Sequence, residues 1–116
     1  MLGICLGLHI IAGKFGGSVH PGHSGGYGPV EVGICEQDDI LAGYPDRVSV
    51  WASHADEVTA MPAHFTLLAR SDICAIEAIA LSEQHIYGLQ WHPEVSHTFE
   101  GSRVFTNFDR IIRETG

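Results

Sequence analysis

A glycine-flanked cysteine at the start of the chain constrains the fold more than any other feature. Residues 3–7 read Gly-Ile-Cys-Leu-Gly, after apolar residues and before apolar positions at helical spacing. Glycines on both sides of a nucleophile permit a sharp, strained strand-to-helix turn, where bulky side chains would clash. The turn leaves Cys5 at a helix N-terminus, where the positive end of the helix dipole favours the reactive thiolate. Cys5 is therefore a candidate nucleophile, and a buried, inert cysteine is the alternative.

A thiolate nucleophile needs a base, and a histidine with a nearby carboxylate lies far downstream. Residues 87–98 read Tyr-Gly-Leu-Gln-Trp-His-Pro-Glu-Val-Ser-His-Thr, so His92 and Glu94 stand two positions apart after an apolar strand-like run. Pro93 fixes one backbone angle between them, which can hold the carboxylate against one ring nitrogen while the other faces a thiol. Alone, the same residues are compatible with polar positions at a strand end. Together, the two motifs predict a triad of Cys5, His92 and Glu94.

The composition is that of one small folded domain without a membrane or nucleic-acid partner. The chain has 116 residues, 45% of them hydrophobic, and a net charge of −8, which disfavours binding to phosphates. No apolar run approaches the roughly 18 residues of a membrane span, and no signal peptide is evident. Three cysteines without framework spacing indicate free thiols in a reducing cytoplasm. Cys35 and Cys74 lie in apolar strand-like runs, so we expect both in the core.

The hydrophobic periodicity predicts an α/β domain with a helix near each end. Strands are expected at 1–4, 29–35, 48–52, 65–69, 74–81 and 86–91, helices at 6–15 and from 99 or 100 to 114, and a mobile loop at 18–28. In the first helix, Leu6, Ile10, Ile11 and Phe15 are expected on one apolar face, which would be buried. The apolar stripe of the last helix consists of Val104, Phe108, Ile111 and Ile112. The close spacing of the strands from residue 65 onward predicts antiparallel hairpins beside a parallel sheet.

The two motifs together resemble the class I, or triad, glutamine amidotransferases. The longer string at residues 92–98, followed by Gly101, is similar to one branch of that family, the glutaminase domain of GMP synthetase. Further similarities to that branch occur in the family's order and spacing at Gly16-Gly17 and at residues 27–32, 51–59 and 70–74. The resemblance implies an α/β, flavodoxin-like fold with a mixed sheet and flanking helices. Residues 1–116 would form a single truncated amidotransferase domain whose first strands are missing.

The resemblance implies catalytic roles for four residues. Cys5 would attack the carboxamide carbon of glutamine, and His92 would carry the proton from the thiol to the departing ammonia. Glu94 would fix the tautomer of His92 and stabilise its cation. Leu6, the residue after the nucleophile, would donate its backbone N–H to the tetrahedral oxyanion. A glycine-rich loop that supplies the second oxyanion donor in the family belongs to the missing part.

Four further residues are implied to bind the substrate, L-glutamine. The backbone of Ser53 and His54 would contact the α-carboxylate, and Asp56 would bind the α-ammonium group. A turn residue before a strand is the alternative for Asp56. His9 stands where the family has a glutamine, four residues after the nucleophile, and an imidazole lacks the paired donor and acceptor of an amide. Binding at this position is therefore expected to differ from the family pattern.

The resemblance also implies a partner that consumes the ammonia. An ATP-pyrophosphatase, as a further domain or a separate synthetase subunit, would use the ammonia and ATP to aminate XMP to GMP in purine nucleotide biosynthesis. ATP and Mg²⁺ would belong to that partner. We therefore expect no cofactor and no metal in this chain.

Three other functions are compatible with parts of the sequence. An inactive fragment or interaction module of the same family is favoured by His9 and by the late start of the domain. A γ-glutamyl hydrolase shares the Gln-Trp-His-Pro-Glu string, but residues 95–98 argue against it. A structural zinc site could use His20 and His23, although such a site needs four ligands and no thiol or carboxylate lies close in the sequence.

Overall fold

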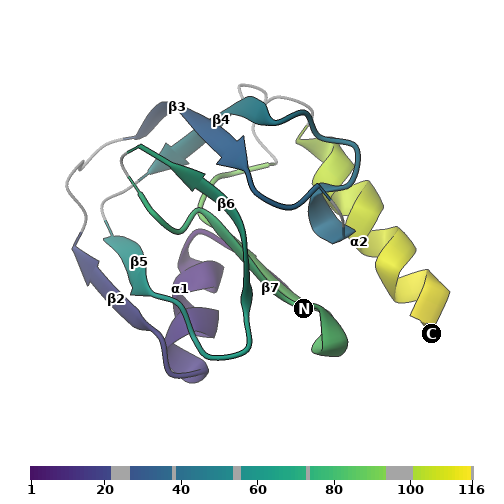
Figure 1. Cartoon of the computed structure of the whole chain (residues 1–116), viewed down its shortest axis with the longest axis horizontal. Coiled ribbons are helices and arrows are strands. Elements are labelled where there is room, and N and C mark those ends of the chain that lie inside the picture. The colour runs from purple at the N-terminus through teal and green to yellow at the C-terminus, as the bar shows by residue number, and fades with distance from the viewer. Residues whose placement is uncertain (22–26, 38, 54–55, 73, 94–100, 116) are drawn as a thin grey trace.

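The computed structural model describes residues 1–21, 27–37, 39–53, 56–72, 74–93 and 101–115 (Figure 1). In these residues a six-stranded mixed sheet is flanked by two α-helices, and a two-stranded sheet lies beside the first helix. The helices are α1 (Leu6–Lys14) and α2 (Ser102–Thr115), with the single-turn 3-10 helices η1 (Asp39–Leu41) and η2 (Ser82–Gln84). The predicted α/β architecture with a helix near each end is confirmed.

The large sheet combines one parallel pair with an antiparallel remainder. In spatial order its strands are β1 (Leu2–Ile4), β8 (Ile86–Leu89), β7 (Ala78–Leu81), β6 (Thr66–Ser71), β3 (Tyr27–Ile34) and β4 (Arg47–Ser53). Strand β1 pairs in parallel with β8, and every other pair is antiparallel. The predicted parallel strand at residues 1–4 and the hairpins after residue 65 are both confirmed. The first and the eighth strands of the chain thus become neighbours.

The small sheet corrects the prediction of a mobile loop at residues 18–28. Strand β2 (Ser18–Pro21) pairs antiparallel with β5 (Asp56–Ala60), while residues 22–26 lie outside the described part. His20 Nδ1 lies 2.6 Å from Thr59 Oγ1 across this pair. Strand β5 has a weak sequence pattern, because its five residues include two acids and only Glu57 and Val58 are buried.

Helix α1 buries a different face from the one predicted. Leu8, Ile11 and Ala12 are buried against the sheet, whereas Leu6 is 68% exposed and Ile10 is 62% exposed. The assignment of Leu6 and Ile10 to the buried face was therefore wrong. Because α1 is apolar on nearly all sides, helical spacing is satisfied by more than one stripe, and contact with the sheet selects the buried one.

Two paired glycines bring α1 close to the sheet. Gly3 of β1 and Gly88 of β8 are register partners. A Cβ atom on Gly88 would lie 2.6 Å from Leu8 Cδ1, and one on Gly3 would lie 2.7 Å from Ile11 Cδ1. At Gly3 a Cβ atom would also meet the backbone of Gly7 and push the helix outward, whereas at Gly88 the end of the Leu8 side chain would have to move. The N-terminus of α1 is thereby fixed at the carboxyl ends of β1 and β8.

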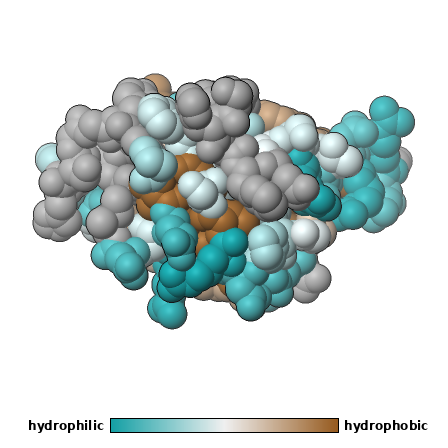
Figure 2. Space-filling view, turned by 90° about the horizontal axis from the view of Figure 1, so that it is seen from above, coloured by the Kyte–Doolittle hydropathy of each residue, from teal (hydrophilic) through white to brown (hydrophobic). Residues whose placement is uncertain are grey.

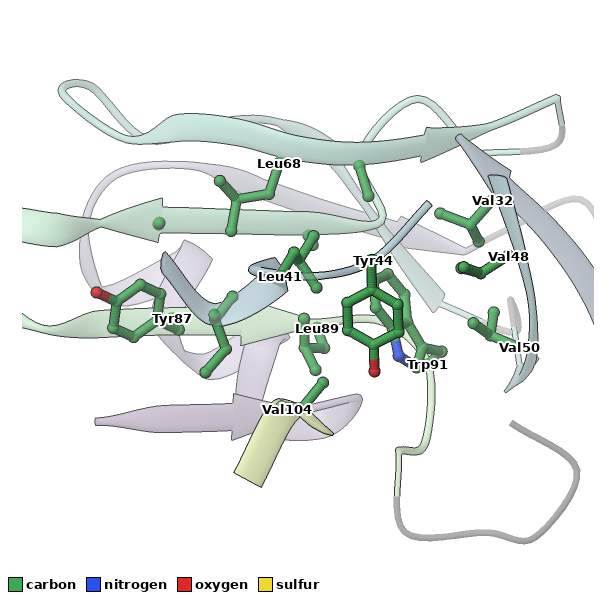
Figure 3. Packing of buried hydrophobic residues seen from close by; sticks show 14 of the residues in the cluster. Val32, Leu41, Tyr44, Val48, Val50, Leu68, Tyr87, Leu89, Trp91 and Val104 are labelled. Atoms are coloured by element: carbon green, nitrogen blue, oxygen red, sulfur yellow. The ribbon is translucent and has the colours of Figure 1, made fainter. Parts of the chain in front are cut away.

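The larger hydrophobic core lies between the sheet and the layer formed by α2 and η1 (Figure 3). Leu89 and Trp91, at and just beyond the end of β8, point into this core with Val104 of α2. Asn107 donates two hydrogen bonds of 3.0 Å from Nδ2, to the carbonyls of Ile40 and Ala42 at η1. Helix α2 is therefore held by both apolar packing and hydrogen bonds.

The predicted stripe of α2 is largely confirmed. Val104 and Ile111 are buried, and Phe108 is half-buried with its ring 6.2 Å from that of Tyr87 in an edge-on arrangement. Ile112 is 45% exposed, so its place on the buried stripe was wrong. The opposite side of α2 is hydrophilic, as its end at the right of Figure 2 shows.

The cysteines divide into one buried and two accessible thiols. Cys74 is buried as predicted, and burial raises the pKa of its thiol to about 12. Cys35 is exposed, which contradicts the predicted core position, because it follows the end of β3 and begins the turn toward η1. In the described part of the chain, no helix is both long and apolar enough to cross a membrane.

Candidate active site

The turn between β1 and α1 holds Cys5 in the conformation expected of a nucleophile at a strained turn. Cys5 has φ 54° and ψ −102°, a region that residues with a Cβ rarely adopt. Its backbone N–H donates a 2.7 Å hydrogen bond to the carbonyl of Leu89, which ties the turn to the end of β8. The predicted strained strand-to-helix turn with Cys5 at the helix N-terminus is confirmed.

The two glycines that flank the nucleophile play different roles. A Cβ atom on Gly3 would lie 2.6 Å from the carbonyl carbon of Gly7, so only glycine fits at position 3. A Cβ atom on Gly7 would meet no other atom of the described residues within 4 Å. The expected clash is therefore found at Gly3 and not at Gly7.

Strand pairing brings His92 to the same end of the sheet as Cys5. Ile4 and Leu89 are register partners in the parallel pair, and Cys5 and His92 follow the carboxyl ends of these two strands. The half-buried His92 is fixed by its backbone N–H, which donates a 2.9 Å hydrogen bond to the carbonyl of Trp51. Residues at the carboxyl ends of neighbouring parallel strands are placed to act on one substrate.

The structure describes only some of the other predicted catalytic and substrate-binding residues. Leu6 is the first residue of α1, so its N–H is one of the four that have no acceptor within the helix. Ser53 ends β4, where its backbone is described and its side chain is not. Glu94 and His54 lie outside the described residues, so the third member of the triad stays a prediction.

Gln90 connects the predicted substrate-binding residues and was missed by the sequence analysis. Its side chain is fully buried, with Oε1 3.0 Å from His9 Nε2. Its Nε2 donates a 3.3 Å hydrogen bond to the carbonyl of Asp56, whose side chain is exposed at the start of β5. The available signal was a polar residue inside an apolar run, two positions before His92. The structure thus links His9 and Asp56 through Gln90.

Two glutamates, Glu57 and Glu77, are buried on the segments whose carbonyl groups accept hydrogen bonds from Gln90. Glu77 is fully buried, accepts a hydrogen bond from Ser71 Oγ, and its carbonyl accepts the backbone N–H of Gln90. Glu57 is 8% exposed, and its Oε2 has no hydrogen-bond partner among the described residues. After burial, these two carboxyl groups also raise the pKa of the Cys74 thiol. Cys74 therefore stays protonated and does not compete with Cys5 as a nucleophile.

A polar cleft of about 410 Å³ lies on the outer face of β3, β4 and β6. Its lining includes Glu31, Arg47, Arg70 and Asp72. Arg47 donates a hydrogen bond to Glu31, which raises the pKa of the guanidinium group. The cleft contains none of the residues predicted to bind or hydrolyse glutamine.

Comparison with known protein families shows which family has this architecture. Residues 1–111 match the sequence model of the family described as glutamine amidotransferase class-I. The chain belongs to that family. A glutamine-hydrolyzing GMP synthase subunit of Methanoregula boonei is 69% identical over 114 residues, which are 98% of this chain and 62% of that protein. The corresponding protein of Methanospirillum hungatei is 63% identical over 111 residues, which are 96% of this chain and 59% of that protein.

Solved structures share the amidotransferase fold. A Thermoplasma acidophilum protein described as a GMP synthase subunit superposes with a TM-score of 0.94 at 37% identity, over 98% of this chain and 57% of that one. A glutamine amidotransferase from Thermotoga maritima gives a TM-score of 0.73 at 26% identity, over 98% of this chain and 46% of that one. The predicted family and fold class are confirmed. The chain spans about 60% of the length of its curated relatives.

Of the two histidines in the metal-site alternative, the structure describes His20. Among the described residues, no three or more His, Cys, Asp or Glu side chains come together in a way that could hold a metal ion. His20 instead contacts Thr59, and its proposed companion His23 lies outside the described part.

Proposed function

We propose that this chain hydrolyses the side-chain amide of glutamine and supplies the ammonia for GMP synthesis. The observation that carries the proposal is the strained turn that holds Cys5 at the N-terminus of α1, beside the strand end that leads to His92. The high identity to glutamine-hydrolyzing GMP synthase proteins supports the choice of pathway. Because the chain spans about 60% of these relatives, we propose that further polypeptide completes the working enzyme.

The proposed chemistry uses Cys5 and Leu6 at the turn, together with His92 and Glu94 from the segment after β8. The Cys5 thiolate attacks the amide carbon of glutamine, and the backbone N–H of Leu6 stabilises the oxyanion that forms. His92 takes the proton of the thiol and gives it to the amide nitrogen, which leaves as ammonia. Glu94 orients His92 through the ring nitrogen that does not face the thiol. Water then attacks the glutamyl thioester, which releases glutamate and regenerates Cys5.

The substrate-binding part of the proposal uses the residues at the ends of β4 and β5. The backbone of Ser53 and His54 binds the α-carboxylate of glutamine, and the exposed carboxylate of Asp56 binds its α-ammonium group. The position of Asp56 supports this role, because its carbonyl is bound to Gln90, which lies two residues before His92.

The partner in this proposal is an ATP-pyrophosphatase that aminates XMP to GMP. The partner binds ATP and Mg²⁺, and this chain contributes ammonia and no cofactor. Ammonia must travel between the two sites, so we expect the partner to cover the carboxyl ends of β1 and β8.

Ammonia release from glutamine by the purified chain tests the proposal. Cys5→Ala should abolish release, whereas Cys35→Ala should not change it, because Cys35 is an exposed thiol outside the site. An electrophilic glutamine analogue should add one adduct, visible by intact mass, to every variant except Cys5→Ala. Release that persists in Cys5→Ala would contradict the assignment of the nucleophile.

A second assay includes an ATP-pyrophosphatase, XMP and ATP, with either glutamine or an ammonium salt as the nitrogen source. The wild-type chain should support GMP formation from glutamine, and Cys5→Ala should support it from ammonium alone. If ammonium supports GMP formation but the wild-type chain never releases ammonia from glutamine, the chain is an interaction module. Hydrolysis of γ-glutamyl peptides in preference to glutamine would favour a γ-glutamyl hydrolase.

A further inference from the structure

Gln90 joins three separate segments of the site through one side-chain amide. We propose that Gln90 is a positioning residue that holds the helix of Cys5 and the strand of Asp56 in register with His92, and that it fixes His9 as the tautomer protonated at Nε2. The consequences for glutamine rest on the proposed function. The tautomer of His9 follows from the structure alone and can be measured without turnover.

The direction of the Gln90 amide is set by the chemistry of its partners. The carbonyl oxygen of Asp56 can only accept a hydrogen bond, so the NH₂ group of Gln90 must face it. The opposite end, Oε1, then faces His9 Nε2 at 3.0 Å. Because Oε1 is also only an acceptor, His9 Nε2 must carry a hydrogen.

A reversed amide would be strongly disfavoured at this depth. Reversal would place Oε1 against the Asp56 carbonyl, with two acceptors facing each other. Gln90 is fully buried, so water does not relieve that repulsion. The imidazole of His9 is thus held as a donor through Nε2.

The three segments are those that carry the predicted catalytic and binding groups. His9 lies one helical turn after the nucleophile, and its backbone N–H donates a 3.2 Å hydrogen bond to the carbonyl of Cys5. Gln90 stands two residues before His92, and Asp56 begins β5. The relative positions of nucleophile, base and ammonium-binding carboxylate therefore depend on this amide.

The same link explains how His9 is accommodated where the family has glutamine. A glutamine at position 9 could present an NH₂ group to Gln90 Oε1, and the Nε2–H of His9 presents an equivalent donor. The donor toward Gln90 is kept, while the second polar atom of the side chain differs. Variants at position 9 therefore test the hydrogen-bond donor of that residue, and variants at position 90 test the amide that accepts from it.

The first test reads the tautomer of His9 by ¹⁵N NMR of the full 116-residue chain. The chain has eight histidines, and the resonances of His9 are identified by their loss in His9→Gln. At about pH 8, above the ordinary pKa of histidine, His9 should be in the Nε2–H form. Gln90→Met keeps the size of the side chain but removes its oxygen and its NH₂ group. In this variant His9 should populate both neutral tautomers. A neutral Nδ1–H form in the wild type would overturn the proposal, as would an unchanged tautomer in Gln90→Met.

Gln90→Glu separates the two contacts and remains informative if Gln90→Met does not fold. The carboxylate still accepts a hydrogen bond from His9, but it cannot donate to the Asp56 carbonyl. The Nε2–H signal of His9 should persist. In the glutaminase assay the KM for glutamine should rise roughly tenfold while kcat stays within about threefold, since loss of one buried hydrogen bond to a backbone carbonyl costs about that much. Gln84→Glu on the exposed η2 is the matched control.

Variants of His9 complete the test of the donor. His9→Leu, which has no donor, should lower kcat more than His9→Gln, which restores one. An equal loss in both variants, or an unchanged KM in Gln90→Glu, would overturn the positioning role. If the wild-type chain releases no ammonia from glutamine even with the ATP-pyrophosphatase present, the proposed function fails. The NMR measurement then still decides the link between His9 and Gln90.

Discussion

Most side chains that helix α2 presents to solvent are charged or polar, whereas helix α1 presents a leucine and an isoleucine that are more than 60% exposed. On α2, the exposed side chains of Arg113 and Asp109 form an ion pair with Nε and Oδ2 2.8 Å apart, and the end of α2 at the right of Figure 2 is hydrophilic. On α1, Leu6 and Ile10 are both more than 60% exposed. The two helices flank the same sheet, yet only α2 has the contrast between faces that a surface helix normally shows.

The difference shows what each helix is built to do. Helix α2 is an amphipathic layer over the larger core, where Asn107 hydrogen-bonds η1. Helix α1 must place the turn of Cys5 over β1 and β8, and its position is set by the glycines at 3 and 88. Helix α2 is therefore held mainly by contacts of its side chains. The position of α1 also depends on how closely it approaches the backbone of the sheet.

The largest expected effect comes from adding a Cβ atom at Gly3, where α1 lies close to β1. In Gly3→Ala the new Cβ meets backbone atoms of Gly7, so the helix must shift and the free energy of unfolding should fall by about 3 kcal/mol. Gly7→Ala faces open space inside a helix and should raise stability by up to about 1 kcal/mol. Urea unfolding monitored by circular dichroism measures both. Equal losses in the two variants would show that α1 is not held by close contact.

Two adjacent isoleucines of α1 test which face of the helix contributes to the free energy of unfolding. Ile11→Ala should lower the free energy of unfolding by about 3 kcal/mol, because Ile11 is 3% exposed and its loss leaves a cavity. Ile10→Ala should change it by no more than about 0.5 kcal/mol. Thermal and denaturant unfolding of the pair give the difference directly. A large loss in Ile10→Ala would mean that the outer face of α1 is covered in solution.

On α2, the hydrogen bonds of Asn107 should matter less than the contact of α1 with the sheet. Asn107→Ala leaves the carbonyls of Ile40 and Ala42 without their donor and should lower the free energy of unfolding by about 2 kcal/mol. The neighbouring Thr106→Ala, on the exposed side, should change it by less than about 0.5 kcal/mol. Hydrogen exchange at η1 should also accelerate in Asn107→Ala. If η1 stays equally protected, α2 is held by its apolar stripe alone.

The smallest expected effect is that of the surface ion pair on α2. Asp109→Ala should lower the free energy of unfolding by about 0.4 kcal/mol at low salt, because exposed pairs at this helical spacing contribute little. The difference from the wild type should disappear near 1 M salt, where the charges are screened. A larger effect that salt does not change would point to a role for Asp109 in packing.

Features set by short stretches of the chain were predictable from the sequence. The turn at Cys5 and the face of α2 containing Val104 and Ile111 follow from local spacing, and so do the hairpins after residue 65. The buried face of α1 was not predictable, because its apolar residues satisfy several stripes and the sheet makes the choice. Strand β5 was missed since its short sequence has a weak pattern.

The candidate site shows the same division. Cys5 and His92 stand in recognisable motifs, and the parallel pairing of β1 with β8 places the strand ends that lead to them side by side. The role of Gln90 depends on partners 81 and 34 positions away in the sequence, which no local pattern reveals. The roles of Glu94 and His54 stay predictions, because both residues lie outside the described part.

The pairing of β1 with β8 determines when the site can exist during synthesis of the protein. Leu2 pairs with Tyr87, about 85 residues later. A ribosome that adds roughly 5–20 residues each second needs several seconds to cover that interval. Until then the segment of Cys5 has no neighbouring strand, and closing so long a loop comes late in folding. The nucleophile is therefore translated well before its neighbouring strand, so nascent chains that stop before residue 86 carry the thiol without the site that would activate it.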